Sequence, residues 1–244
     1  MTLDRRHFLA AAAASPLAAS LPMTGARAQA ANTIKIGVLN DMSGPFRDIS
    51  GPTSVVATRT AVQDFGSRGF TVEVLSADHQ NRPDVGVSIS RQWLDRDGVD
   101  VIVDVPNSAV ALAVNGVVRE RNKVYLNSTA ATVELTGAQC SPNTVHWTYD
   151  TWMLSRSTGG AMVRAGGQSW YFITADYAFG HSLQAQTEDF VRRAGGRVVG
   201  AVRHPFPGTT DFSSFLLQAQ ASRAQVVGLC NACLLYTSPS PRDS

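Results

Sequence analysis

Charge, cysteine and long apolar segments are all scarce in this sequence. Only 16% of the 244 residues are charged, the formal net charge is +2, and three cysteines occur. An odd number of cysteines leaves at least one thiol unpaired. Because Lys and Arg are scattered and nearly balanced by acids, the composition argues against a nucleic-acid partner. Beyond the N-terminal region no apolar run is long enough to span a bilayer, so we expect no stable membrane insertion there.

The common catalytic and cofactor motifs are also missing. There is no G-x-S-x-G elbow, no G-x-G-x-x-G after the first predicted strand and no G-x-x-x-x-G-K-[ST] loop. Five histidines occur, and the four beyond residue 28 are spread along the chain without metal-ligand spacing: His79, His146, His181 and His204. Cys230 and Cys233 have the spacing of a redox pair but lack its usual strand-to-helix setting, so we interpret the spacing as coincidence. These absences predict a protein that is not an enzyme and that holds no cofactor or metal.

The N-terminal residues have the features of an export signal. Arg5 and Arg6 precede an apolar run over residues 9–21, and Ala26-Arg27-Ala28 offers a cleavage site with small residues. This order predicts a twin-arginine-type signal peptide over residues 1–28 and a periplasmic location. An amphipathic N-terminal helix is the alternative.

Apolar periodicity along the rest of the chain predicts strands that alternate with helices. The first series has strands at 33–41, 70–77, 99–105 and 123–127 and helices at 52–65, 84–97 and 108–121. After an irregular excursion at 134–150, a second series has helices at 151–165, 179–194 and 210–222 and strands at 169–175, 197–203 and 225–229. The pattern predicts an α/β fold with doubly wound, mostly parallel sheets.

We therefore expect an N-terminal lobe at 33–148 and an incomplete second lobe at 149–230, with a single continuous sheet as the alternative. Residues 233–244, CLLYTSPSPRDS, have no apolar periodicity. We interpret this segment as a non-native tail rather than a native disordered C-terminus.

One stretch, VDVIVDVPNSAVALAV at residues 99–114, suggests where a ligand binds. It reads as a buried strand, a break at Pro106, and a helix that begins near Asn107 and Ser108. The helix N-terminus presents free N–H groups, which attract an anion. In an open α/β sheet, ligands lie at the carboxyl ends of the strands, where Asn107 and Ser108 fall. The plainer alternative is that the pair only caps the helix.

Five stretches together resemble the periplasmic solute-binding proteins of ABC transporters, of the branched-chain amino-acid type. They are IKIGVLNDMSGPF (34–46), residues 99–114, VYLNSTAAT (124–132), FITADYAFG (172–180) and PGTTDFSSFL (207–216). The resemblance runs from about residue 33 to residue 229. It implies a type I periplasmic-binding-protein fold with two lobes around a cleft and an ABC transporter permease as partner. It also implies capture of a small polar solute by hinge closure. A ligand-sensing receptor on the same fold, or a hydrolytic α/β enzyme, is the alternative.

The resemblance also implies which residues contact the solute. The first lobe would hold the ligand's head group through backbone N–H and hydroxyl groups, at Asn107, Ser108, Ser128, Thr129, Ala130, Ala131 and Thr132. Aromatic residues would enclose the rest of the ligand: Phe46, Tyr149, Tyr177 and Phe179. Pro106-Asn107-Ser108 replaces the Ser–Ser of leucine-binding relatives, and Phe179 stands where they have a ligand-contacting tyrosine. The ligand therefore stays open among a branched-chain amino acid, an amide, a short carboxylate and an aromatic acid.

Overall fold

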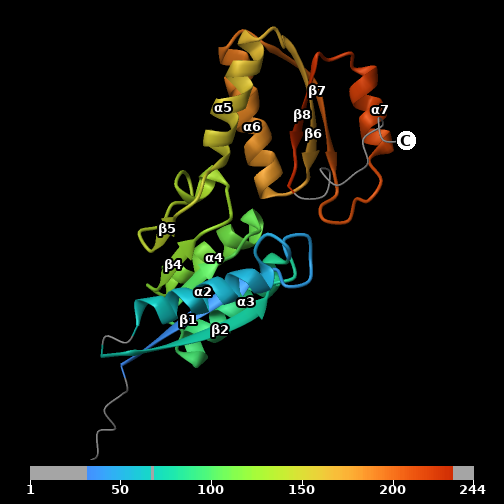
Figure 1. The fold of residues 1–244 in the computed structure, drawn as a ribbon. Coiled ribbons are helices and arrows are strands. Elements are labelled where there is room, and N and C mark those ends of the chain that lie inside the picture. The colour runs from blue at the N-terminus through green and yellow to red at the C-terminus, as the bar shows by residue number, and fades with distance from the viewer. Residues whose placement is uncertain (1–31, 67–68, 233–244) are drawn as a thin grey trace, which may run out of the picture.

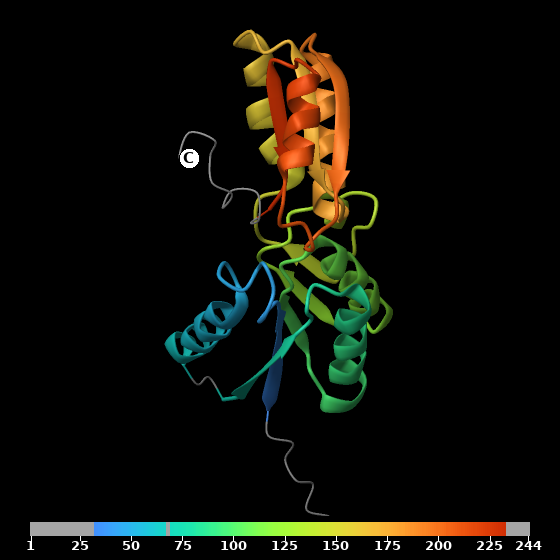
Figure 2. The same ribbon diagram turned by 90° about the vertical axis from the view of Figure 1, so that its right-hand side faces the viewer.

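Two parallel sheets, each with its own helices, make up the described part of the protein. The computed structural model describes residues 32–66 and 69–232, and Figures 1 and 2 show the two lobes stacked end to end. The predicted signal peptide and the predicted tail lie outside the described residues. Among the described helices, none combines the length and apolar character that a membrane crossing needs.

The first lobe is built on a five-stranded parallel sheet with the order β2-β1-β3-β4-β5. Its strands are β1 (Thr33–Asn40), β2 (Thr71–Asp78), β3 (Val101–Asp104), β4 (Val124–Asn127) and β5 (Thr144–His146). Its helices are α2 (Gly51–Phe65), α3 (Pro83–Gln92), which continues into a π-helical turn at Trp93–Asp97, and α4 (Ser108–Glu120). A 3₁₀ turn (Val133–Leu135) follows β4.

Helices α3 and α4 cover one face of this sheet because their apolar side chains point toward it. Val110, Val114 and Val118 of α4 are fully buried in a cluster that also contains Leu39 and Ile102 of the strands. Trp93 lies so close over β1 that a Cβ atom at Gly37 would stand 2.5 Å from its ring. Glycine at that position therefore permits the close approach of helix and sheet.

The second lobe is built on a three-stranded parallel sheet with the order β7-β6-β8. Its elements are α5 (Thr151–Arg164), β6 (Ser169–Ala175), α6 (Ala178–Arg193), β7 (Arg197–His204), α7 (Ser213–Ala221) and β8 (Val226–Cys230). All seven residues of the central strand β6 are buried. Trp170 and Phe172 pack among residues of α5 and α6, whereas Tyr171 and Ile173 pack on the face that carries α7.

The predicted fold class is confirmed, and the alternation of strands and helices follows the expected ranges closely. Two separate sheets form, so the single-sheet alternative is wrong. Two local differences stand out. The third strand ends at Asp104 rather than Val105, because these residues have left-handed φ values of 78° and 59°. Part of the expected excursion forms the short strand β5, which extends the first sheet beyond β4.

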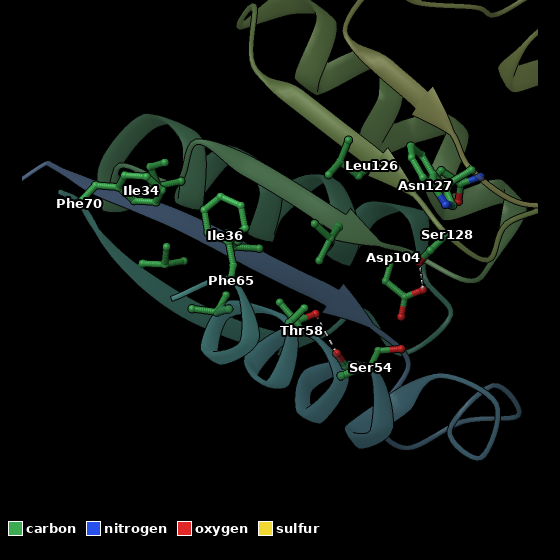
Figure 3. Close-up of a pocket in the computed structure, with 16 residues that line it drawn as sticks. Ile34, Ile36, Ser54, Thr58, Phe65, Phe70, Asp104, Leu126, Asn127 and Ser128 are labelled. Carbon is green, nitrogen blue, oxygen red and sulfur yellow. Dashed lines mark hydrogen bonds between the residues drawn. The ribbon is translucent and has the colours of Figure 1, made fainter. Parts of the chain in front are cut away.

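An apolar groove of about 600 Å³ runs along the face of the first sheet that α3 and α4 leave uncovered (Figure 3). Residues of α2, β1 and β4 line it, among them Ile36, Phe65 and Leu126. A parallel sheet is normally covered on both faces. We therefore interpret the part that follows the strands as a packing surface, whereas one end of the groove reaches Asp104, Asn127 and Ser128 at the carboxyl ends of β3 and β4.

The carboxyl ends of both sets of strands face each other at the junction between the lobes (Figure 2). Phe46 and Ala131, which follow β1 and β4, share one buried cluster with Ala175, Tyr177 and Phe179, which lie at the end of β6 and the start of α6. The fold therefore brings the strand ends of the two lobes to one place, the geometry that favours ligand binding in α/β proteins.

Candidate ligand-binding cleft

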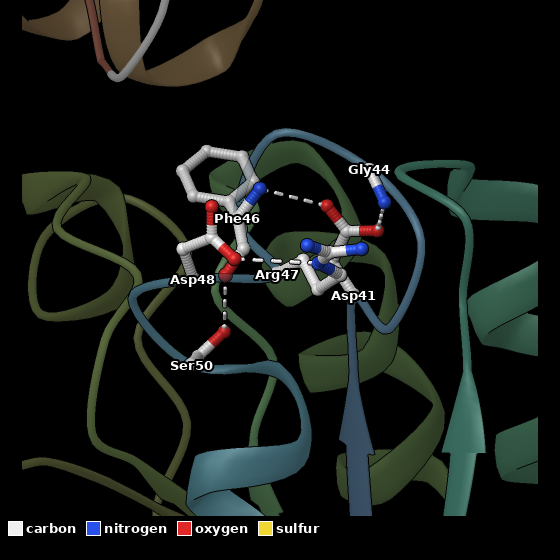
Figure 4. Close-up of polar contacts among 6 residues, drawn as sticks. All are labelled: Asp41, Gly44, Phe46, Arg47, Asp48 and Ser50. Atoms are coloured by element: carbon white, nitrogen blue, oxygen red, sulfur yellow. Dashed lines mark hydrogen bonds and ion pairs between the residues drawn. The ribbon is translucent and has the colours of Figure 1, made fainter.

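Asp41 organises the loop that follows β1. Its buried carboxylate accepts hydrogen bonds from the N–H groups of Gly44 (2.8 Å) and Phe46 (2.9 Å), as Figure 4 shows. It also accepts one from the side-chain amide of Asn81, in the loop after β2. These bonds turn the loop so that the Phe46 side chain packs against the second lobe.

Asn107 caps helix α4 and joins the same hydrogen-bond network. Its Oδ1 accepts from the N–H groups of Ala109 (2.8 Å) and Val110 (3.2 Å), and its Nδ2 donates to Oδ1 of Asn81 (3.0 Å). Both ends of the Asn107 side chain are therefore occupied. The buried Ser108 follows it, and its hydroxyl group forms no hydrogen bond within the described part of the chain. At this helix N-terminus, Ser108 is the side chain with a donor still available.

The turn after β4 is held by Asn127. Its Nδ2 donates to the carbonyl of Ala130 (2.6 Å), and its Oδ1 accepts from the N–H of the same residue (3.0 Å). The carbonyl of Ala131 accepts from the N–H of Thr151 (2.8 Å), which ties the turn to the start of α5. Ala131 and Thr132 are buried, and their N–H groups have no acceptor within the described part of the chain. Adjacent N–H groups of this kind form a concave site for an anion.

Ser128 and Thr129 differ from their neighbours because their hydroxyl groups already have a partner. Ser128 Oγ donates to Oδ1 of Asp104 (3.0 Å), and Thr129 Oγ1 donates to the same oxygen. Ser128 is exposed and Thr129 is half-buried. Of the seven predicted first-lobe residues, Ser108, Ala131 and Thr132 keep free donors, and the hydroxyl hydrogens of Ser128 and Thr129 are committed to Asp104. The Asn107 side chain and the Ala130 N–H are already bonded.

Aromatic rings of the second lobe cover this edge. Tyr177 precedes the first residue of α6 and stacks on Phe206, with ring centroids 4.2 Å apart and planes inclined by 13°. The centroids of Phe206 and Phe46 are 6.0 Å apart. The ring centroids of Phe179 and Tyr177 are also 6.0 Å apart. Three predicted aromatic contacts, Phe46, Tyr177 and Phe179, are thus brought together, whereas Tyr149 is 50% exposed beside the crossing to α5.

The edge of the first lobe carries buried negative charge. Asp41 and Asp104 are buried, and neither forms an ion pair with a basic side chain in the described ranges. Burial lowers the pKa of the His79 imidazole, although the carboxylates of Asp41, Asp78 and Asp104 oppose that shift. His79 Nδ1 accepts from the N–H of Asn81 (3.1 Å), so the neutral ring carries its proton on Nε2. His79 therefore adds no positive charge in its neutral form.

Four contributors to this site were not predicted: Asp41, Asn81, Asp104 and Phe206. Asp41 comes directly after β1 and Asp104 is the last residue of β3, and a buried acid at the end of a strand is a signal that could have identified them. Phe206 lies in an irregular loop after β7, where no periodicity marks it. Within residues 32–66 and 69–232, no group of three or more His, Cys, Asp or Glu side chains could hold a metal ion.

Comparison with known proteins agrees with this architecture. A family model described as periplasmic binding protein matches residues 33–233. A Leu/Ile/Val-binding protein homolog 4 from Brucella abortus is 26% identical over 225 residues, which cover 86% of this chain and 53% of the relative. The chain therefore spans about half the length of the curated relatives that it matches.

Two solved structures are similar at higher identity. A periplasmic binding protein from Burkholderia mallei has a TM-score of 0.80 and 50% identity, covering 83% of this chain and 54% of that one. A branched-chain amino-acid ABC transporter periplasmic ligand-binding protein from Burkholderia xenovorans has a TM-score of 0.65 and 39% identity, covering 80% and 52%.

Proposed function

The chain belongs to the periplasmic binding protein family, and we propose that it acts as the substrate-binding component of an ABC importer. It captures a small polar solute between the two lobes and passes it to a membrane permease. The predicted signal peptide supports a periplasmic location. One observation carries the proposal: free N–H donors of the first lobe and aromatic rings of the second meet where the strand ends of both sheets converge.

The polar end of the solute binds first, on the first lobe. The N–H groups of Ala131 and Thr132 and the hydroxyl of Ser108 donate to its negatively charged or carbonyl oxygens. These donors are held in place before binding, because Asn127 and Asn107 fix the two turns that carry them. Little conformational entropy is therefore lost at these backbone groups on binding.

The second lobe then closes over the solute. Tyr177 and Phe179, at the start of α6, cover its apolar part. The hinge lies at Thr151, whose N–H and hydroxyl group both bond to the turn after β4. Because the solute contacts both lobes only in the closed state, its binding shifts the population toward closure. This mechanism requires no bond to be made or broken, so the proposed role is binding and not catalysis.

The test is a ligand screen on the full-length protein. Thermal denaturation is measured with branched-chain amino acids, primary amides, short carboxylates and aromatic acids, and a stabilising compound is then titrated by calorimetry. In the Ser108→Ala variant we expect the affinity to fall about tenfold or more, because a hydrogen bond to a charged group is worth about 1.5–3 kcal/mol. Ser157→Ala, an exposed serine on α5, serves as the matched control. Absence of any stabilising compound, or turnover of one of them, would contradict the proposal.

A further inference from the structure

Asp104 occupies an unusual place at the end of β3. Its side chain is 2% exposed, and its backbone φ of 78° lies in the left-handed region, which non-glycine residues seldom adopt. Tyr125 donates to its carbonyl oxygen (3.2 Å) and holds the backbone at this point. The strained backbone and the bond from Tyr125 together place the carboxylate directly under the turn after β4 (Figure 3).

The carboxylate is held by neutral donors on both of its oxygens. Oδ2 accepts from Nδ2 of Asn40 (2.9 Å), and Oδ1 accepts from the hydroxyl groups of Ser128 (3.0 Å) and Thr129. In the described part of the chain, no Lys, Arg or His forms an ion pair with it. Hydrogen bonds to a charged acceptor are stronger than those between neutral groups. The two hydroxyl groups are therefore held firmly in this orientation.

This orientation decides what Ser128 and Thr129 can offer to a ligand. A hydroxyl group has one hydrogen to donate and two lone pairs. Since both hydrogens point to Asp104, only lone pairs remain for a ligand, and the charge behind them makes those oxygens more negative. The free donors are elsewhere, at Ser108, Ala131 and Thr132. The predicted first-lobe residues thus include both donors and acceptors.

We propose that Asp104 is a specificity-determining positioning residue, which keeps Ser128 and Thr129 as acceptors for an N–H group of the ligand. It favours a solute whose carboxylate or carbonyl oxygen neighbours an ammonium or amide N–H, and it disfavours a simple carboxylate of the same shape. The inference rests on the proposed function, because it concerns the solute that the cleft selects.

The test compares pairs of probes of similar shape, of which one member carries an N–H donor and the other is a plain carboxylate. Affinities of the full-length protein are measured by calorimetry for L-leucine against 4-methylpentanoate and for benzamide against benzoate. In Asp104→Asn the charge is lost and the hydroxyl groups are free to turn. We expect the selectivity for the donor-bearing member over the plain carboxylate to fall about tenfold. Asp100→Asn is the matched control, because it removes the same charge just before the opposite end of β3, where the backbone N–H of Lys35 and the ammonium group of Lys123 donate to it.

A second variant keeps the inference testable if Asp104→Asn folds poorly. Thr129→Val leaves the charge in place and removes one acceptor at a half-buried position, so we expect it to weaken the donor-bearing probes and leave the carboxylates unchanged. If Asp104→Asn and Thr129→Val change both members of each pair equally, the inference is wrong while the binding function stands. If the wild-type protein binds none of the four probes and no other compound of the screen, the proposed function fails, and this inference fails with it.

Discussion

The ring of Phe46, from the first lobe, packs against the ring of Phe206, from the second, with centroids 6.0 Å apart and planes inclined by 59°. The Tyr177 ring stacks on the same Phe206 ring, with centroids 4.2 Å apart. A loop of the first lobe therefore contributes to the apolar surface of the second. Asp41 sets the position of Phe46 through its bond to the Phe46 N–H (2.9 Å), which links backbone hydrogen bonding to the contact between the lobes.

Replacing Phe46 by alanine should weaken the junction between the lobes. Phe46 is 4% exposed, and loss of a buried phenylalanine side chain costs about 3–5 kcal/mol. Phe46→Leu keeps most of the apolar volume and loses the aromatic pairing, worth about 1 kcal/mol. The measurement is chemical denaturation of both variants. Equal losses of unfolding free energy in the two variants would contradict the packing described here.

Asn107→Ala should destabilise helix α4 and the loops joined to it. The variant loses the oxygen that accepts from Ala109 and Val110 and the amide that donates to Asn81. Loss of such a cap costs about 1–2 kcal/mol. Asn107→Asp retains the capping oxygen and adds an acid at the helix N-terminus, so it should keep most of the stability. An affinity loss in Asn107→Ala with no change in unfolding free energy would instead indicate direct ligand contact.

Stability should fall as the pH falls through the range in which histidine titrates. Burial lowers the pKa of His79, and burial also lowers that of His146. A pKa below the unfolded value of about 6.5 means that the unfolded state binds more protons in this range. The contribution to stability is therefore complete above that value and is lost as the pH falls through the folded-state pKa values.

The variants His79→Gln and His146→Gln separate the two histidines. Denaturation midpoints are measured from pH 8 to pH 5, and each variant should show a flatter decline than the wild-type protein. We expect the larger effect for His79, which is fully buried. An unchanged decline in His79→Gln would contradict the assignment.

The cysteines should differ sharply in reactivity. Burial raises the pKa of the Cys230 thiol to about 12, whereas Cys140 is exposed. Because the thiolate is the reactive form, iodoacetamide at pH 8 should label Cys140 in minutes and Cys230 only after unfolding. Peptide mapping by mass spectrometry distinguishes the two sites. Rapid labelling of Cys230 in the native protein would show that its end of β8 opens readily.

The alternation of strands and helices could be predicted from the sequence because it depends on local pattern. Buried strands such as β6 read as continuous apolar runs, and helices such as α4 repeat apolar residues with the helical period. The role of Asn107 as a helix cap followed from its position between strand and helix, as did its place at the carboxyl end of β3. The parallel arrangement then brought the predicted residues after β3 and β4 to one edge.

The contacts at the candidate site depend on residues far apart in the chain, and only the tertiary structure decided them. Asp104 meets Ser128 and Thr129, 24 and 25 positions later, and the direction of its side chain depends on a left-handed backbone that no local pattern indicates. Phe206 meets Phe46 from an irregular loop 160 residues away. A short-range sequence pattern specifies which face of an element is apolar, whereas the choice of a partner across lobes depends on how whole sheets pack. The division of the site into donors and acceptors therefore emerged only when the strand ends were brought together.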